Sequence, residues 1–400
     1  MMFLTPTEQK MLSGEHGVAV QQSMEILVAL GKIYGADKMI PVTSVQVAGV
    51  SYKTIGDAGL EYLNDLVSNG AKVQVPTFLN PAGIDVTQWK ELGVPEHFAK
   101  KQIEILNAYV AMGIQNTCTC TPYLIGIKPK LGEHISWSES SAVAYANSVL
   151  GARTNREGGP SALAAAICGV TPNYGFHLDK NRVSDFVVNV ECELNDESDF
   201  GAMGYYIGAI VKNRNPAFVG IEKDSTSTDR LKALGAAMAA SGSVGLFFVE
   251  NVTPEFNVSG KAEKISFTEK ELRETKEKIN AESEKENAKP QLVSIGCPHA
   301  SIDEIKRVAG IIKRKNITKL KCDLWICTAR ETKKKAEALG LARVIEAVGG
   351  KIVADTCMIV CPLEQMGFRV TACNSGKAAK YLPSLCKQKV VFGNLEELIC

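Results

Sequence analysis

Hydrophobic positions along the chain alternate between two spacings. Short β-rich runs such as MIPVTSVQVAG (39–49) and AKVQVPTFLNPAG (71–83) are each followed by a stretch of helical periodicity, AGLEYLNDLVSNG (58–70) and EHFAKKQIEILNAYVAMG (96–113). Strands and helices that alternate in this way are typical of α/β proteins, in which helices connect neighbouring parallel strands. The sequence therefore predicts an α/β fold with mainly parallel sheets.

The C-terminal part of the chain shows this pattern most clearly. The runs QLVSIGCPHAS (291–301), CDLWICT (322–328) and GGKIVADTCMIV (349–360) each predict a buried strand. The segments between these strands have the periodicity and length of helices. This βαβαβ order predicts a parallel sheet with right-handed crossovers.

Capping boxes mark several helix starts. In this motif a serine or threonine precedes a glutamate by three residues, and the two side chains satisfy free backbone amides at the helix end. The sequence predicts four of them, at Thr5 and Glu8, Thr268 and Glu271, Ser301 and Glu304, and Thr328 and Glu331.

Residues 268–290 form the one break in composition. The segment TEKELRETKEKINAESEKENAKP is charged almost all round and is stopped by Pro290, which predicts a solvated helix bridging two lobes. A chain of 400 residues also exceeds the size at which a single core stops growing. We therefore expect an N-terminal region over 1–285, made of two sub-lobes, and a C-terminal βαβαβ lobe over 286–400.

Composition narrows the classes of partner. The formal net charge of +1 gives no indication of nucleic acid or an anionic membrane as a partner. No apolar run is long enough to span a bilayer, and the N-terminal MMFLTPTEQKMLSGEHG lacks the apolar core of a signal peptide. We expect a cytoplasmic protein, in which the 12 cysteines are mostly thiols.

Several of these cysteines follow predicted strands. Cys297 and Cys357 each lie just past the carboxyl end of a parallel strand, where open α/β sheets bind ligands, and Cys118 and Cys120 follow another strand. Buried small side chains at strand ends are the alternative interpretation. The spacing matches neither a zinc ribbon nor a ferredoxin, so any metal site combines distant segments. Three such thiolates suit an iron–sulfur cluster with one open iron, a Lewis acid for dehydration.

The segment ARTNREGGPSALAAA (152–166) is a candidate anion site. Arg153 and Arg156 lie shortly before a glycine pair that precedes an alanine-rich helix, and helix N-termini of this kind bind phosphate or carboxylate. CNSGKAAKY (373–381) is a second candidate, with Lys377 at a predicted helix start. A plain loop entering a helix is the alternative for both. Asn155 and Gly158 belong to the first of these segments. Glu139, Ser140 and Ser141, shortly after Cys120, and Asn80 could line the crevice of the cysteines, with polar loops facing solvent as the alternative; His177 and His299 are expected in hydrogen-bonding roles.

Several motifs together resemble the aconitase X family, in particular its stand-alone large subunits. The resemblance spans the whole chain and rests on LTPTEQKMLSGEHG, PTFLNPAGID, TCTCTPYLIG, SESSAVAYANSVLGARTNREGGPSALAAAICG, HLDKNR, GCPHAS, ADTCMIVCP and CNSGKAAKYLP. It implies aconitase-like three-layer α/β/α lobes around a central cluster. The NREGGPSALAAA stretch is most similar to archaeal members that dehydrate (R)-5-phosphomevalonate to trans-anhydromevalonate 5-phosphate in isoprenoid synthesis. Other members dehydrate cis-3-hydroxy-L-proline.

The resemblance also implies a set of metal ligands. The cysteines that match its cluster motifs are Cys120 before Thr-Pro-Tyr, Cys297 in Gly-Cys-Pro-His and Cys357 in Asp-Thr-Cys. The alternates nearby are Cys118, Cys361 and Cys373. The implied cofactor is a [4Fe–4S] cluster, with [3Fe–4S], [2Fe–2S] or mononuclear iron as alternatives. The substrate-binding candidates are Asn80, Ser140, Arg153, Asn155, Arg156, Gly158 and Lys377.

The resemblance implies a partner as well. Enzymes of the aconitase type carry the catalytic base, a serine, on a swivelling domain, which in the split members of the family is a small second subunit. We therefore expect this chain to bind cluster and substrate and to need a small subunit, in a heterodimer or heterotetramer. Two other classes stay open, a non-catalytic α/β protein with buried cysteines and a cysteine-nucleophile enzyme.

Overall fold

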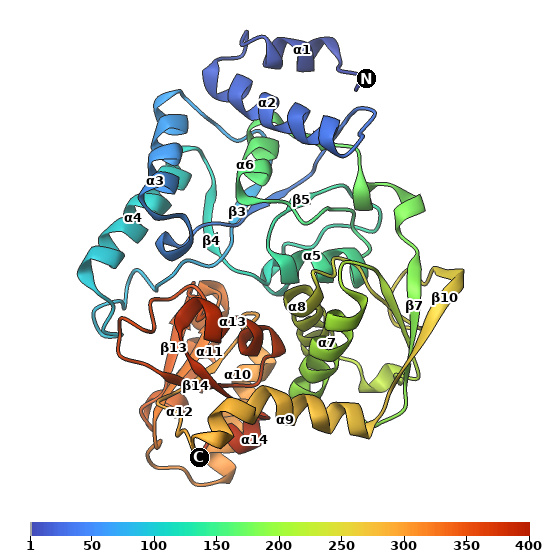
Figure 1. Cartoon of the computed structure of the whole chain (residues 1–400). Helices are drawn as coiled ribbons and strands as arrows, with labels where there is room; N and C mark the ends of the chain where they lie inside the picture. Colours follow the sequence, from blue (N-terminus) through green and yellow to red (C-terminus); the bar gives the residue numbers. More distant parts are fainter. Residues whose placement is uncertain (1) are drawn as a thin grey trace.

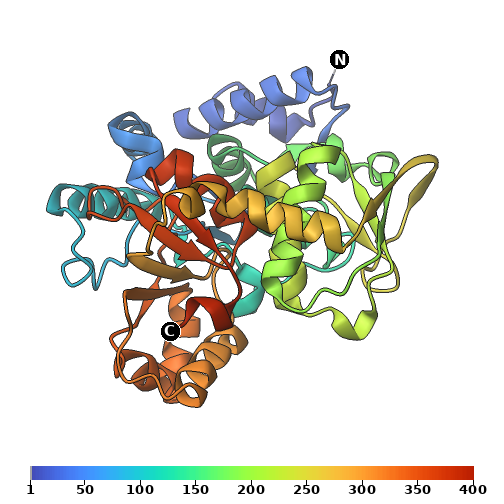
Figure 2. The same ribbon diagram turned by 60° about the horizontal axis from the view of Figure 1, so that its bottom comes forward.

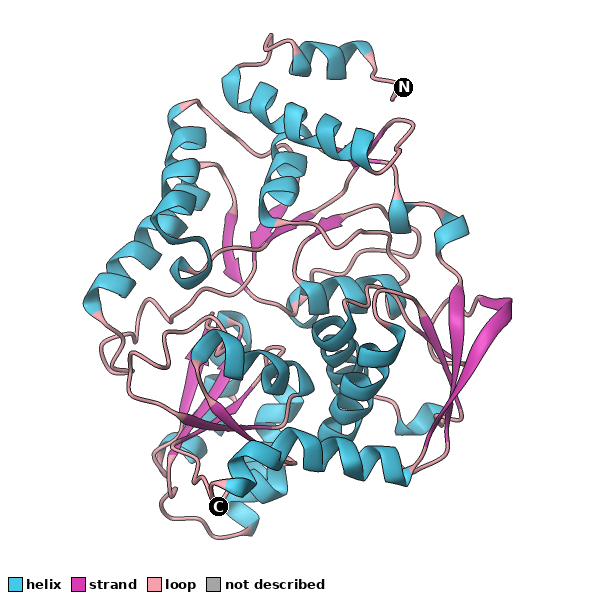
Figure 3. Ribbon diagram, viewed as in Figure 1, coloured by secondary structure: helices cyan, strands magenta, loops and turns pink. Residues whose placement is uncertain are grey.

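The computed structural model describes residues 2–400 and contains three parallel β-sheets with helices packed around them (Figures 1 and 3). The α/β class with mainly parallel sheets is thereby confirmed. A separate antiparallel pair, β1 (Met39–Pro41) with β6 (Val170–Pro172), closes one side of the first lobe.

The first sheet has the strand order β4-β3-β2-β5. Its strands are β2 (Val45–Val47), β3 (Thr77–Leu79), β4 (Gln115–Cys118) and β5 (Ser136–Trp137). The helices around it are α1 (Pro6–Leu12), α2 (Val18–Ile33), α3 (Tyr52–Ser68), α4 (Glu96–Ala111), α5 (Ser140–Ser148) and α6 (Gly159–Cys168). Helix α6 lies directly on β2, and α2 packs on α6, so the alanine-rich sequence of α6 is buried between them.

The second sheet has the order β10-β7-β8-β9. Its strands are β7 (Ser184–Val190), β8 (Pro216–Val219), β9 (Phe248–Val249) and β10 (Val258–Phe267), and it is covered by α7 (Glu197–Val211) and α8 (Thr228–Gly242). The glycines of α7 let the two helices touch, because a Cβ at Gly204 would lie 2.5 Å from the Leu234 carbonyl oxygen. Helix α8 also packs against α5 of the first lobe.

The third sheet confirms the predicted βαβαβ unit and adds two strands to it. Its order is β13-β12-β11-β14-β15, all parallel. The strands are β11 (Leu292–Ile295), β12 (Asp323–Thr328), β13 (Lys351–Ala354), β14 (Val370–Cys373) and β15 (Lys389–Phe392). The helices are α10 (Ile302–Arg314), α11 (Arg330–Ala338), α12 (Leu341–Glu346), α13 (Gly376–Cys386) and α14 (Leu395–Leu398).

Three of the four predicted capping boxes are confirmed, those that begin α1, α10 and the charged helix α9 (Glu269–Lys285). The fourth prediction is wrong. Helix α11 begins after Ala329, which makes no side-chain cap, because β12 extends through Thr328 and the Thr328 hydroxyl donates to the Ala300 carbonyl oxygen at 2.6 Å. That hydroxyl is therefore bonded to the loop after β11 and does not cap α11.

Helix α9 runs from the end of β10 past α7 to the third sheet (Figures 1 and 2). It packs on α7 and on β15, and only Leu272, Thr275 and Ser283 are buried along it. Nearly all of its charged side chains therefore remain in solvent. Within residues 2–400, no helix combines the length and the apolar character needed to cross a membrane.

Candidate functional site

The carboxyl ends of the first and third sheets meet. Ala82, which follows β3, forms a parallel bridge with Thr356, which follows β13. The Ala82 amide donates to the Asp355 carbonyl oxygen at 2.8 Å, and the Cys357 amide donates to the Ala82 carbonyl oxygen at 3.1 Å. Loops after parallel strands of two different sheets are thus joined, at the kind of edge where α/β proteins bind ligands.

Three cysteines from separate strands gather at this junction. Cys120 follows β4, Cys297 follows β11 and Cys357 follows β13, and the first two are only 5% and 8% exposed. Burial raises the pKa of each of these thiols above its ordinary value. Charge on Cys357 and then on Cys120 would raise the pKa of Cys297 further, since the three groups are neighbours. The structure therefore brings together the three cysteines that the sequence singled out.

A buried ion pair faces these thiols. Lys377 in the first turn of α13 pairs with Glu139, the N-cap residue of α5. Burial alone would raise the pKa of Glu139, but the Lys377 ammonium and a 2.6 Å hydrogen bond donated by the Asn80 amide hold it below its usual range. Burial would lower the pKa of Lys377, but Glu139 and the three thiols raise it. Both groups are therefore charged at neutral pH.

Serine and asparagine side chains lie beside this ion pair. Ser141 donates to Glu139 Oε1 at 3.1 Å, and Ser140 begins the same helix. The side-chain oxygen of Asn80 is buried and has no hydrogen-bond partner among the described residues. An unsatisfied buried acceptor is rare in native proteins, which makes this oxygen a candidate for contact with a ligand.

His299 lies in the same cluster, in a hydrogen-bonding role. Its amide donates to Cys120 Sγ at 3.1 Å, and its ring lies within hydrogen-bond distance of Thr119 and Thr356. Burial lowers the pKa of His299 to about 4, so the imidazole is neutral at pH 7. His177 is elsewhere, with its Nδ1 2.9 Å from His134 Nδ1.

The segment that carries the arginines runs alongside β5, and this places Arg153 away from the cysteines. The Arg153 amide donates to the Glu133 carbonyl oxygen at 2.9 Å, before β5 begins, and the Glu157 amide donates to the Trp137 carbonyl oxygen at 3.3 Å, where β5 ends. Arg153 therefore lies at the amino end of β5. Its guanidinium pairs there with Asp179 at 2.8 Å.

The remaining residues of this segment have different environments. Asn155 is engaged on both sides of its amide, donating to the Tyr174 carbonyl oxygen at 3.1 Å and accepting from the Phe176 amide at 2.9 Å. The exposed Arg156 side chain lies beside Gly245. Gly158 is the N-cap residue of α6, at the carboxyl end of the first sheet, where a Cβ on Gly159 would lie 2.5 Å from the Ala48 carbonyl oxygen.

The alternate cysteines are buried in other contacts. Cys118 belongs to the core of the first lobe, and its thiol donates to Asn116 Oδ1 at 3.3 Å. The Cys361 thiol lies 3.7 Å from Met366 Sδ, and the Cys373 thiol donates to the Ser375 carbonyl oxygen at 3.7 Å.

One supporting group was missed by the sequence reasoning. Asp85 is fully buried and accepts from the Ala354 amide at 3.1 Å and from Arg330 at 3.0 Å, while Arg330 also pairs with Asp355 at 2.7 Å. These bonds fix the strand end that precedes Cys357. The local signal was Asp85-Val-Thr87, an Asx turn in which Asp85 also accepts from the Thr87 amide at 2.9 Å.

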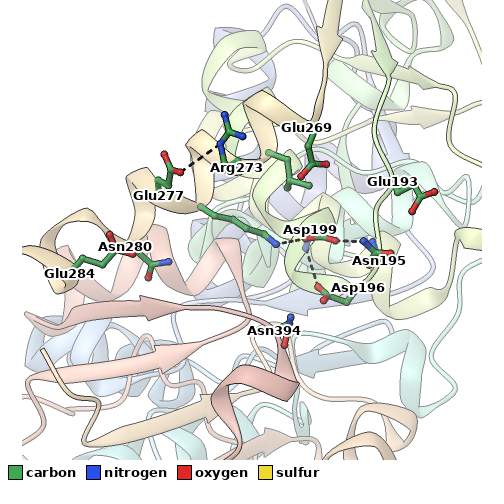
Figure 4. Close-up of a pocket in the computed structure, with 12 residues that line it drawn as sticks. Glu193, Asn195, Asp196, Asp199, Glu269, Arg273, Glu277, Asn280, Glu284 and Asn394 are labelled. Atoms are coloured by element: carbon green, nitrogen blue, oxygen red, sulfur yellow. Dashed lines mark hydrogen bonds and ion pairs between the residues drawn. The ribbon is translucent and has the colours of Figure 1, made fainter. Parts of the chain in front are cut away.

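The described residues hold no preformed site for a single ion. Over residues 2–400, no three cysteine, histidine or carboxylate side chains lie close enough to hold one metal ion. A surface hollow of about 400 Å³ lies between α7, α9 and Asn394, and none of the three cysteines lines it (Figure 4). Its walls are mainly acidic, and its Lys276 pairs with Asp199.

Comparison with known proteins covers the whole chain. Family models described as aconitase X first, second and third domains match residues 1–180, 184–277 and 290–400. The phosphomevalonate dehydratase large subunit of Methanocaldococcus jannaschii is 51% identical over 100% of this chain and 99% of its own length. That of Methanothermobacter thermautotrophicus is 52% identical, over 100% and 98%.

A more distant relative and a solved structure extend the comparison. The cis-3-hydroxy-L-proline dehydratase of Pseudomonas aeruginosa is 35% identical over 97% of this chain, which spans 68% of that protein. A crystal structure of Thermococcus kodakaraensis aconitase X in its holo-form superposes with a TM-score of 0.92 at 46% identity, covering 99% of both chains. With all three domain models matched in order, and with relatives this similar along the full length, the chain belongs to the aconitase X family.

Proposed function

We propose that this chain is the large subunit of a phosphomevalonate dehydratase. The proposed reaction removes water from (R)-5-phosphomevalonate to give trans-anhydromevalonate 5-phosphate, in the archaeal mevalonate pathway. The observation that carries the proposal is the full-length identity of 51% and 52% to two relatives named for this activity, joined to a junction where three thiols face a buried ion pair.

The three thiols are chemically suited to an iron–sulfur cluster, and we propose that Cys120, Cys297 and Cys357 hold it. Burial raises the pKa of each thiol, so three thiolates at this junction need a bound cation to be stable. A [4Fe–4S] cluster with one iron free of protein ligands would supply a Lewis acid for the leaving hydroxyl, with a smaller cluster or a single iron as the alternative.

The side chains around the cysteines are suited to an anionic substrate that carries a hydroxyl group. We propose that the Lys377 ammonium meets the carboxylate and that the unsatisfied Asn80 oxygen accepts from a hydroxyl. Ser140 and Gly158 lie at the starts of α5 and α6, where free amides favour anions. Arg156 is our candidate for the phosphate. Asn155 is engaged by protein partners, and Arg153 pairs with Asp179 and Glu255 at the amino end of β5, where its Nη1 has no partner among the described residues.

We propose that a small partner subunit carries the base that removes the proton from the substrate carbon. Dehydration breaks one C–H and one C–O bond and forms a C=C bond, so an acid function and a base function are both needed. The similar archaeal chains are named large subunits, and the longer Pseudomonas aeruginosa enzyme has about a third of its length outside the match. Both observations support a small subunit that brings the base.

An activity assay separates the two substrates known in the family. We expect the reconstituted chain, mixed with its small subunit, to convert (R)-5-phosphomevalonate, with the product and its loss of one water identified by mass spectrometry. Neither subunit alone should turn over, because each lacks one of the two functions. Conversion of cis-3-hydroxy-L-proline instead would move the chain to the other activity.

The two arginines of the candidate anion segment should behave differently. Arg156→Ala is expected to raise KM for phosphomevalonate roughly 10-fold or more, the usual effect of losing a hydrogen bond to a charged group. Arg153→Ala should leave KM unchanged and lower the unfolding midpoint in urea, because its guanidinium pairs with Asp179 at the opposite end of β5. Steady-state kinetics of both variants decide the assignment, and the reverse pattern would move the phosphate to Arg153.

A further inference from the structure

His299 uses all four of its polar atoms, and they reach every loop that carries one of the three cysteines. Its amide donates to Cys120 Sγ at 3.1 Å. Its Nδ1 lies 3.2 Å from Thr119 Oγ1, next to Cys120, and its Nε2 lies 2.9 Å from the carbonyl oxygen of Thr356, next to Cys357. Cys297 is two residues before it in its own loop. One buried side chain therefore links the three cysteine loops.

The hydrogen-bond partners also fix the tautomer of the ring. A carbonyl oxygen only accepts, so Nε2 must carry the hydrogen that is donated to Thr356. In the neutral ring Nδ1 is then an acceptor, and the Thr119 hydroxyl donates to it, while the same hydroxyl oxygen accepts from the Thr121 amide at 3.1 Å. The ring thus has a single orientation, held from both ends.

The backbone of His299 is anchored by the second lobe. The Lys232 ammonium on α8 is 2% exposed and donates to the His299 carbonyl oxygen at 3.1 Å. Lys232 also pairs with Glu304 on α10 and with Asp229 at 3.1 Å. The amide that faces Cys120 therefore belongs to a residue whose carbonyl group is fixed as well.

We propose that His299 is a positioning residue for the metal centre, which sets the spacing of the Cys120, Cys297 and Cys357 loops and aims its amide at the Cys120 sulfur. The inference rests on the proposed cluster ligands but adds a residue that binds no iron. Residues that orient metal ligands through hydrogen bonds commonly change metal affinity when they are replaced. A hydrogen bond to a ligand sulfur also changes the reduction potential of a cluster.

Three substitutions separate the two ring contacts. His299→Gln places an amide donor near the Nε2 position, His299→Asn places an amide oxygen near the Nδ1 position, and His299→Ala removes both. We expect His299→Ala to lower iron and sulfide affinity roughly 10- to 100-fold after anaerobic reconstitution. His299→Gln should recover much of the occupancy, with a shifted midpoint potential and altered electron paramagnetic resonance spectrum. His177→Ala, a second buried histidine at the opposite end of the first sheet, should change none of these.

A measurement on the metal-free chain keeps the test independent of the cluster. The alkylation rates of Cys120 and Cys357, followed by mass spectrometry, should rise at least about tenfold in His299→Ala, because the loops lose their tether. Cys192, half-buried and outside the junction, is the internal reference. Wild-type iron content, potential, spectrum and alkylation rates in His299→Ala would overturn the inference. A wild-type chain that takes up no iron would refute the proposed cofactor, and the alkylation rates would still decide the role of His299.

Discussion

Replacing Cys120, Cys297 or Cys357 with serine is expected to remove most of the bound iron and to abolish turnover. Each of these residues comes from a different strand end, and the nearby thiols of Cys118, Cys361 and Cys373 are held in other contacts. A serine hydroxyl is a far poorer iron ligand than a thiolate, because it remains protonated at neutral pH. Iron and acid-labile sulfide per chain, with the visible absorbance spectrum of anaerobically purified protein, measure the effect.

Cys322→Ser is the matched control. Cys322 precedes β12, at the amino edge of the third sheet, and is half-buried. This variant should keep the iron content of the parent chain and its activity with the small subunit. Equal iron in all four variants would refute the ligand assignment. A loss confined to two of the three ligand variants would direct attention to Cys361, which shares the loop of Cys357.

Lys377→Met is expected to lower both stability and activity. The substitution leaves Glu139 as a buried carboxylate without its cation, a change that costs about 3–5 kcal/mol in comparable buried pairs. It also removes the positive charge that faces the three thiols and, in our proposal, the substrate carboxylate. We expect kcat/KM to fall roughly 100-fold or more. Urea denaturation and steady-state kinetics measure the two effects separately.

The double variant Lys377→Met with Glu139→Gln separates packing from function. It removes both charges, so most of the lost stability should return, while activity should not. Recovery of activity along with stability would show that Lys377 only balances Glu139. If neither stability nor activity returns, Lys377 and Glu139 make further contacts that the double variant also removes.

The pair also has a defined dependence on pH. The folded-state pKa of Glu139 lies below its ordinary value, so the stability it contributes is present at neutral pH and is lost as the pH falls through that lowered pKa. The folded-state pKa of Lys377 is raised, so its contribution is lost only as the pH rises through that raised pKa. In Lys377→Met, burial raises the folded-state pKa of the Glu139 carboxyl above its ordinary value. Stability should therefore fall as the pH rises toward neutrality, because the buried carboxyl must ionise without a cation.

The strand-end cysteines were predictable because their position follows from a general rule. Once strands before Cys297 and Cys357 are recognised, parallel pairing places both at one edge, and the structure shows this arrangement. The glycine-rich arginine segment was not predictable in the same way. Its local sequence indicates a loop before a helix but not the direction in which that loop runs past β5, and this direction separates Arg153 from Gly158.

Long-range pairing explains the other differences. The pairing of Lys377 with Glu139 joins α13 of the third lobe to α5 of the first, and nothing in either local sequence specifies it. Strands β14 and β15 were not predicted, although at four residues each they are as long as β11 and β13, which were. Thr328 matched a capping box in sequence, but tertiary contact with Ala300 took its hydroxyl.

The bridge between Ala82 and Thr356 has a consequence for how the protein matures. Cys120 leaves the ribosome well before Cys297 and Cys357, and lobes generally fold in the order of synthesis. The proposed centre needs thiols from both sheets, so it would be complete only after the last lobe has docked, and its iron would be inserted after synthesis. A group bound only in the docked state also shifts the docking equilibrium by mass action. In this proposal, loss of the bound group would weaken the contact between the first and third sheets and make it more accessible to proteases.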